Sequence, residues 1–277
     1  MEPVILAGSP FFYIILVAIG LVIGVYGTLV GLGGGVILLP VLLFLFPGTP
    51  PETLTGVSLS VVFLNAFSGT LAYVRQRRID FRSGMLFTLA TIPGTVVGVW
   101  LLRYVPSSSF RLVFGALLIG VSLLIFLRPQ LEAPQLFSKR GTECALTDSS
   151  GKHFIYRVNR MLGTGISFFV GFIAGLLGIG GGVIHVPAMV YLLCFPVHVA
   201  TATSHFILVF TTLTGVLSHV VFYSGIGDWL VVIFLALGII PGAQLGAYLS
   251  RRLRGNLIVR LLTVALVILG IRLLFRS

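Results

Sequence analysis

Two nearly identical stretches interrupt this apolar sequence: GLGGGVILLP at residues 31–40 and GIGGGVIHVP at residues 178–187. Because glycine costs about 1 kcal/mol per residue in a helix relative to alanine, three consecutive glycines predict a break in helical structure. Broken backbone at membrane depth is tolerated only where it is buried in protein or lines a wet cavity. Both stretches are therefore candidates for a functional site. The alternative is that these glycines only let two helices approach closely.

The composition is that of a polytopic membrane protein. Of the 277 residues, 57% are hydrophobic and 9% are charged, and the mean hydropathy of +1.12 lies outside the range of soluble domains. The net charge of +11 comes from cations in a few short loops. This is how inner-membrane proteins orient themselves, so nucleic-acid binding is a poor explanation of the charge.

The ends and the cysteines add two expectations. Residues 1–10 contain no Lys or Arg, so they lack the cationic start of a secretory signal, and we expect the first apolar segment to be retained. Cys144 and Cys194 have no metal-ligand spacing, and neither a disulfide nor a zinc site is expected. Cys194 is interpreted as a small core residue rather than as a reactive thiol.

The hydropathy pattern predicts an all-α fold of two repeats. Residues 1–127 form the first transmembrane repeat, 128–160 a polar cytoplasmic linker, and 161–277 the second repeat. The predicted helical segments cover residues 10–28, 33–47, 54–74, 84–103, 110–127, 161–177, 181–195, 199–222, 229–249 and 256–275. The second and seventh are shorter than the roughly 20 residues that a spanning helix needs. We therefore expect each to form a re-entrant hairpin with the segment before it.

The halves repeat each other beyond the glycines. At a nearly constant offset, two sets of polar and small residues face each other: Thr55, Ser58, Asn65, Ser68 and Gly69 against Thr201, Ser204, Thr211, Thr214 and Gly215. The dipeptides Pro93-Gly94 and Pro241-Gly242 match in the same way. Small changes of offset are what loops of different length would produce.

Charge predicts that the two repeats are inverted. A cationic loop follows the third segment, but the matching loop at residues 223–229 holds Asp228 and no cation. Placing the arginine-rich loops and the linker in the cytoplasm leaves only Arg103, Arg111, Arg272 and Arg276 outside. Equivalent loops then lie on opposite sides of the bilayer, each half crosses an odd number of times, and both termini are outside.

An inverted repeat predicts a binding site near the midplane, between the halves. A short helix that begins at Gly33, Gly34 and Gly35, or at Gly180, Gly181 and Gly182, would point free N–H groups and its positive dipole end inward. Two such ends would favour a bound anion.

A polar stripe on the third and eighth segments supplies side chains for the same site. The spacing of Thr55, Ser58 and Asn65 keeps them on one helix face, and the other half repeats the pattern. The candidate side chains are Thr55, Ser58, Asn65, Ser204, His205 and Thr211. Hydroxyl and amide groups can replace water around an anion without adding charge. The alternative is that they only bond neighbouring helices, at about 0.6 kcal/mol each.

Histidines and carboxylates bear on the mechanism. His198, His205 and His219 share a heptad face but, at about 1.5 Å per residue, lie too far apart to hold one metal ion. His205 is the best candidate for an ionisable group in the path, with simple packing as the alternative. No Asp or Glu lies in the core of a predicted span. An anion leaving a cell with a negative interior gains about 2.3 kcal/mol per charge and 100 mV, so export needs no coupling ion.

The chain resembles the TauE/SafE family of membrane transporters. The resemblance rests on the two glycine stretches, on Thr55-Gly56-Val57-Ser58 and residues 201–205, and on the two Pro-Gly helices, and it covers nearly all the chain outside residues 128–160. It implies export of sulfite, sulfoacetate or a related organosulfonate, with no cofactor and no enzymatic activity.

Other functions stay open at this point. One is import of a sulfur anion such as thiosulfate, driven by an ion gradient. Another is a membrane redox protein that uses the histidines, and a third is a structural membrane subunit. The expected partners are the anion and the lipid bilayer, with a homo-oligomer left open.

Overall fold

The computed structural model describes residues 10–127 and 141–254, together with residues 257, 258, 260, 263, 264, 267 and 268. The described chain contains, in order, α1 (Pro10–Val30), α2 (Gly35–Leu45), α3 (Pro51–Arg75), α4 (Phe81–Leu102), α5 (Ser107–Leu127), β1 (Thr142–Thr147), β2 (His153–Val158), α7 (Arg160–Leu177), α8 (Gly182–Tyr191), α9 (Val197–Tyr223) and α10 (Trp229–Ser250). Nine of the predicted helical segments are confirmed. The tenth, at residues 256–275, falls largely outside the described residues, as do the termini and residues 128–140.

Six described helices are long and apolar enough to cross a membrane: α1, α3, α4, α7, α9 and α10. This confirms a predominantly helical, multi-pass membrane protein. The two helices that follow the glycines, α2 and α8, have 11 and 10 residues and are too short to span. Because α1 and α7 are long enough for a full crossing, the re-entrant hairpins stay a prediction.

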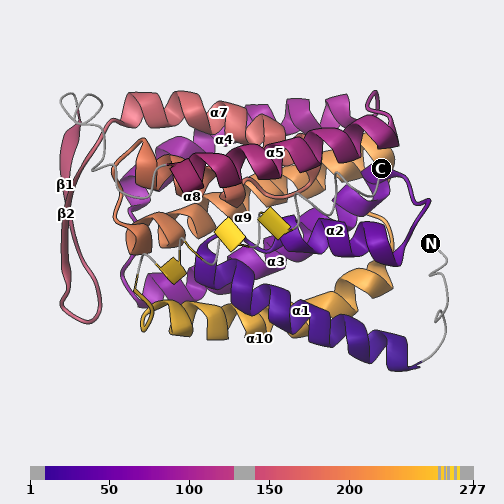
Figure 1. The fold of residues 1–277 in the computed structure, drawn as a ribbon, viewed down its shortest axis with the longest axis horizontal. Helices are drawn as coiled ribbons and strands as arrows, with labels where there is room; N and C mark the ends of the chain where they lie inside the picture. Colours follow the sequence, from indigo (N-terminus) through magenta and orange to yellow (C-terminus); the bar gives the residue numbers. More distant parts are fainter. Residues whose placement is uncertain are drawn as a thin grey trace.

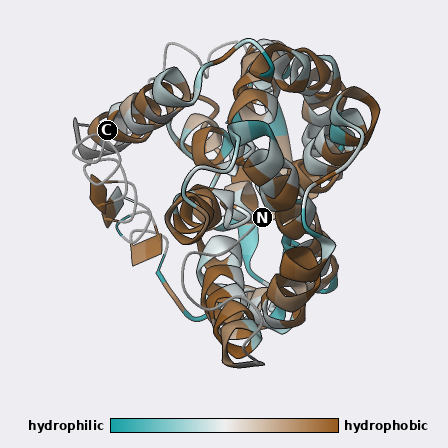
Figure 2. Ribbon diagram, turned by 90° about the vertical axis from the view of Figure 1, so that its right-hand side faces the viewer, coloured by the Kyte–Doolittle hydropathy of each residue, from teal (hydrophilic) through white to brown (hydrophobic). Residues whose placement is uncertain are grey.

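The long helices run side by side around a central pair (Figure 1). In the centre, α3 packs against α9. On the flanks, α1 packs along α10 and α4 along α7, while α10 also contacts α3 and α4 also contacts α9. The hydrophobic residues of Figure 2 cover much of the outer helices, and large apolar side chains such as Phe11, Val22 and Leu237 are exposed there. This is the surface that a lipid environment requires.

Glycine allows the flanking helices to approach closely. A Cβ atom at Gly98 of α4 would lie 2.1 Å from the carbonyl oxygen of Phe172 on α7, and one at Gly238 of α10 would lie 1.9 Å from that of Val17 on α1. Helices in membranes associate largely through such packing, because lipid provides no hydrophobic driving force. The Pro-Gly helices of the two halves therefore have a packing role.

A β-hairpin lies where the sequence predicts only a polar linker. β1 and β2 pair antiparallel, with Thr142 opposite Val158. Along β2 the burial alternates, so that Phe154, Tyr156 and Val158 face inward and pack against Leu193 and other residues around the α8–α9 connection. The alternation of side chains at period two is the signal for a strand that a reading of polarity alone misses.

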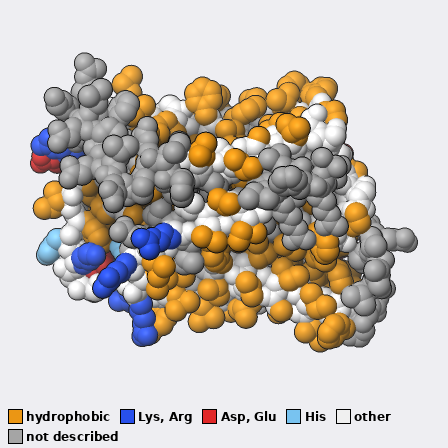
Figure 3. All heavy atoms as spheres, in the orientation of Figure 1, with side chains coloured by type: hydrophobic (Ala, Val, Ile, Leu, Met, Phe, Trp, Pro, Cys, Tyr) orange, Lys and Arg blue, Asp and Glu red, His pale blue; other side chains and the backbone are white. Residues whose placement is uncertain are grey.

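The arginine-rich loop lies at the same end as the hairpin. Arg78 forms an ion pair with Asp148 of the hairpin turn, at 3.2 Å, and the Gln76 amide donates to the carbonyl of Ala247 near the end of α10. We call this the arginine-rich end: residues 76–82, the hairpin at 142–158 and residues 247–254. In Figure 3 the visible Lys and Arg side chains gather at this end.

The loop that matches residues 76–80 by sequence lies at the other end of α3. A Cβ atom at Gly227 would lie 2.8 Å from Val57 Cγ2 and 3.1 Å from the Thr53 carbonyl oxygen, both in the N-terminal part of α3. The loop at residues 76–80, by contrast, follows the C-terminus of α3. Equivalent loops of the two halves thus lie at opposite ends of one helix.

Close helix packing gives the first prediction. Replacing Gly98 by Ala should lower the free energy of unfolding by about 1–3 kcal/mol, the usual cost of overpacking, because the new methyl group would overlap the backbone of α7. Gly120→Ala on α5 is the control, since no atom of the described residues lies within 4 Å of its Cβ position, and it should be neutral or stabilising by up to about 1 kcal/mol. Thermal unfolding in detergent compares the two variants, and equal melting temperatures would refute the packing role.

Candidate functional site

The two glycine turns, residues 31–34 and 178–181, meet inside the molecule. Gly34 caps α2 with φ of 85° and Gly181 caps α8 with φ of 90°, a left-handed conformation that glycine adopts without a Cβ penalty. A Cβ atom at Gly35 would lie 2.7 Å from the carbonyl oxygen of Ile179, and one at Gly182 would lie 2.7 Å from that of Gly31. Each short helix therefore begins against the glycine turn of the other half.

The starts of α2 and α8 carry free backbone donors. Within residues 10–127 and 141–254, no hydrogen bond is donated by the N–H groups of Gly34, Gly35, Gly181 or Gly182, and all four residues are buried. The first N–H groups of a helix have no intrahelical acceptor. They also lie at the positive end of the helix dipole. The free N–H groups and the dipole together make the start of a helix favourable for an anion.

Serines of the central helices hold the glycine turns in place. Ser58 Oγ on α3 donates to the carbonyl of Gly178, at 2.8 Å. Ser204 Oγ on α9 donates to the carbonyl of Gly31, at 3.1 Å. Each serine thus binds a carbonyl group in the glycine turn of the opposite half, and the N–H groups of Gly34 and Gly181 have no acceptor among the described residues.

Asn65 adds a free side-chain donor beside the start of α2. Its side chain is fully buried, and its Oδ1 accepts from Thr28 Oγ1 at 3.1 Å. Its Nδ2 has no acceptor among the described residues and lies 3.9 Å from the Cβ position of Gly34. A buried donor without a partner costs about 1–3 kcal/mol, and such a group calls for an explanation such as a bound ion.

His205 belongs to the Asn65 group. Its Nε2 lies 3.3 Å from Thr28 Oγ1, and its ring packs edge-on against Tyr73 at 5.5 Å. The Tyr73 hydroxyl donates to the carbonyl of Thr28 at 2.8 Å. One end of α1 is therefore linked to both central helices through polar contacts.

Two further predicted residues make their contacts away from the Asn65 group. Thr55 Oγ1 lies 3.3 Å from His219 Nε2. Thr211 Oγ1 lies 3.0 Å from Thr91 Oγ1 on α4. Although Thr211 matches Asn65 in the repeat, its hydroxyl faces α4. The predicted stripe thus forms several separate contacts: Ser58 and Ser204 bond the glycine turns, whereas the Thr211 hydroxyl bonds Thr91.

Sequence reasoning missed Thr28 and Tyr73. Thr28 lies in the last turn of α1, three residues before Gly31, and its match in the second half is Gly175. A search for polar residues present in both halves therefore passes over it. Tyr73 aligns with His219 at the offset of the stripe, so extending the comparison by four residues beyond Gly69 would have found it.

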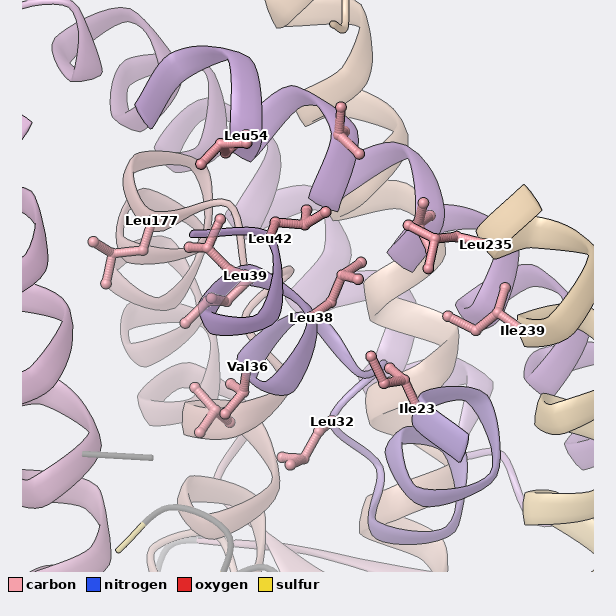
Figure 4. Close-up of a cluster of buried hydrophobic side chains, with 14 of the residues drawn as sticks. Ile23, Leu32, Val36, Leu38, Leu39, Leu42, Leu54, Leu177, Leu235 and Ile239 are labelled. Atoms are coloured by element: carbon pink, nitrogen blue, oxygen red, sulfur yellow. The ribbon is translucent and has the colours of Figure 1, made fainter. Parts of the chain in front are cut away.

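The surroundings of the site are apolar. Figure 4 shows Val36, Leu38, Leu39 and Leu42 of α2 among side chains from α1, α3, α7 and α10. The described carboxylates lie in first turns, N-caps and the hairpin: Glu52, Asp80, Glu143, Asp148 and Asp228. A low local dielectric strengthens the attraction between the free donors and an anion, and no described carboxylate lies within a spanning helix beyond its first turn.

Comparison with known proteins identifies the class of membrane protein. A family model described as "Sulfite exporter TauE/SafE" matches residues 16–273. The "Probable membrane transporter protein YunE" of Bacillus subtilis is 36% identical over 96% of this chain and 98% of its own. A probable membrane transporter protein of Methanocaldococcus jannaschii is 22% identical over 93% of each chain. No solved structure matches the chain.

Gly34 offers a matched test of the site. Gly34 and Gly48 both have φ of 85°, so alanine at either position should cost about 1–2 kcal/mol in backbone strain. A methyl group at Gly34 would lie 2.6 Å from Ile23 Cγ2 and 3.9 Å from Asn65 Nδ2, whereas no described atom lies within 4 Å of the Cβ position of Gly48. We expect thermal stabilisation by sulfite to be lost in Gly34→Ala and kept in Gly48→Ala. Equal stabilisation of both variants would exclude the α2 start as the binding site.

Proposed function

Because the chain belongs to the sulfite exporter TauE/SafE family of membrane transporters, we propose that it exports a small sulfur-containing oxoanion across the cell inner membrane. Sulfite, sulfoacetate and related organosulfonates are the proposed substrates. The family and the names of the relatives indicate a transporter and not an enzyme.

The free donors at the glycine turns are the single observation that carries the anion proposal. The starts of α2 and α8 present N–H groups that have no acceptor within residues 10–127 and 141–254, and the Nδ2 atom of Asn65 lies beside the first of them. All these groups are hydrogen-bond donors, and none carries a negative charge. An oxoanion offers several acceptor oxygens at once and gains from the positive ends of two helix dipoles.

Each predicted site residue has a place in this proposal. Asn65 and His205 would contact the anion or orient Thr28 beside it. Ser58 and Ser204 would hold the two glycine turns in shape. Thr55, beside Gly178 of the second glycine turn, and Thr211 would line the path, where their hydroxyls contact His219 and Thr91.

Alternating access between two inverted repeats is the proposed mechanism. Two pairs of corresponding contacts and one pair of corresponding loops support it. The pairing of α1 with α10 corresponds to that of α7 with α4. The bond from Ser58 to Gly178 corresponds to that from Ser204 to Gly31. The loops at 76–80 and 224–228 lie at opposite ends of α3. A movement of one half against the other would keep the glycine turns central and alternate the open side.

The arginine-rich end is the proposed cytoplasmic side. Arg75 ends α3, Arg77 lies in the loop that follows, and Arg82 lies in the first turn of α4. Arg251 and Arg252 follow α10. Cytoplasmic loops of inner-membrane proteins carry an excess of such cations. In this orientation both termini would lie outside, a prediction that concerns residues beyond the described part.

A change of charge at Asn65 tests the anion site. Asn65→Asp keeps the size of the side chain but replaces the free donor by an acceptor, negative when ionised, so sulfite flux in proteoliposomes should fall about tenfold or more, the factor for one charged hydrogen bond. Asn159→Asp is the control, because Asn159 caps α7 and Asp caps a helix equally well. Equal flux in both variants would remove Asn65 from the site.

The direction of transport can be tested with an imposed membrane potential. Moving one negative charge outward releases roughly 2.3 kcal/mol per 100 mV when the interior is negative. We therefore expect a potassium diffusion potential, negative inside, to accelerate sulfite efflux from loaded liposomes without any proton or sodium gradient. Uptake of thiosulfate that requires a proton or sodium gradient would instead support import.

A further inference from the structure

The arginine-rich end contains a buried guanidinium that is only partly paired. Arg78 is 4% exposed. Its Nε and Nη2 both donate to one oxygen of Asp148, Oδ2, at 3.3 and 3.2 Å. Its Nη1 is buried and has no acceptor among the described residues. Since a guanidinium presents five N–H donors suited to paired oxygens, Arg78 retains capacity for a further oxyanion.

The carboxylate opposite Arg78 belongs to the hairpin turn. Asp148 Oδ1 accepts from the backbone N–H and hydroxyl of Ser150 and from the backbone N–H of Lys152, at 2.8, 2.7 and 3.0 Å. Burial alone would raise the pKa of Asp148, but these bonds and the bond from Arg78 together lower it to about 2. Asp148 is therefore ionised at neutral pH and held mainly by its own turn.

The first turn of α9 lies near Arg78 and Asp148. His198, in the first turn of α9, lies within electrostatic reach of Arg78, Lys152 and Asp148, and its buried Nδ1 has no partner among the described residues. α9 has no side-chain cap at Pro196, and among the described residues the N–H groups of Val197 and His198 have no acceptor, while those of the next two residues bond to the Pro196 carbonyl. The negative charge of Asp148 thus lies near Arg78 and Lys152 and near His198 in the first turn of α9.

The hairpin contacts the helices near Arg78 through two hydrogen bonds and a patch of aromatic packing. The Tyr156 hydroxyl donates to Asp80 Oδ2 at 3.1 Å, and the Ser149 N–H donates to the Gln76 carbonyl at 2.9 Å. Phe154 and Tyr156 pack against Phe195 and Val199 near the start of α9. The hairpin lies beside the ends of the helices and not between them (Figure 1), and moving it outward would break these contacts with the start of α9.

We propose that Arg78 is a first binding site for the transported oxyanion, and that Asp148 occupies this site in the resting protein as a built-in competitor. This inference rests on the proposed function. An arriving sulfite would take both Nη atoms of Arg78 in a bidentate contact. Asp148 would then move into water with the hairpin and uncover the path beside α9. At every stage the buried cation keeps a negative partner, which avoids the cost of an isolated buried charge.

Hydrogen exchange of the full-length protein tests the exchange of partners. Sodium sulfite is compared with sodium chloride at equal ionic strength, and amide exchange is followed over residues 142–158. We expect sulfite to accelerate exchange in the hairpin of the wild type. The control Glu143→Gln, which removes the exposed ion pair with Arg157 on the outer face of the same hairpin, should keep this response.

Flux measurements separate a binding role from a structural one. Asp148→Asn should lower the sulfite concentration for half-maximal flux, because the competitor is weakened. Arg78→Gln leaves Asp148 without its cation and is expected to lose stability, so the double variant Arg78→Gln/Asp148→Asn, which removes both charges, is the decisive one. Its half-maximal concentration should rise about tenfold or more, as expected for the loss of one charged hydrogen bond.

The outcomes distinguish the two proposals. If wild-type liposomes transport sulfite but the double variant has wild-type half-saturation, or the hairpin does not respond to sulfite, Arg78 is only a structural residue and this inference is wrong. If the wild type moves no sulfite while the hairpin still responds, the anion site at Arg78 is supported and the proposed substrate is wrong.

Discussion

Free backbone N–H groups in an apolar interior are the constraint on which this structure depends. The glycine turns end α1 and α7 inside the molecule and begin α2 and α8 there, so the first amides of two helices are removed from water. Such groups need an acceptor, because a buried unpaired amide costs about as much as a lost hydrogen bond. In the part of the chain that the structure describes, these amides have none. The proposed anion would supply this acceptor and so offset the cost.

The rest of the molecule holds the two turns in register. Ser58 and Ser204 reach across to the carbonyl group of the opposite turn, so the shape of each turn depends on the other half. Close packing at glycines such as Gly98 and Gly238 brings the flanking helices into backbone contact. Because packed helices shift between discrete arrangements, the same contacts suit a movement of two halves about a fixed centre.

Charge is distributed so that the interior stays free of carboxylates. The described acidic residues lie in first helical turns, N-caps and the hairpin, and the cations gather at the arginine-rich end (Figure 3). Asp148 is the exception that reaches a buried cation, and it does so from a hairpin attached at the edge of the helices. Carboxylates are thus absent from the described residues around the glycine turns, whereas Asp148 and several arginines lie at the arginine-rich end.

The sequence by itself determined the helices, the short helices after the glycines and the family, because hydropathy, glycine runs and repeated motifs act locally along the chain. It also indicated Asn65, which faces Thr211 in the other half, and His205, which lies beside Ser204 of the repeated stripe. Only the tertiary structure decided that Thr28 joins them, that Thr211 turns toward Thr91, and that Asp148 reaches Arg78. These are contacts between residues distant in sequence, and which partner a buried polar group finds depends on how the helices pack, which no local pattern records.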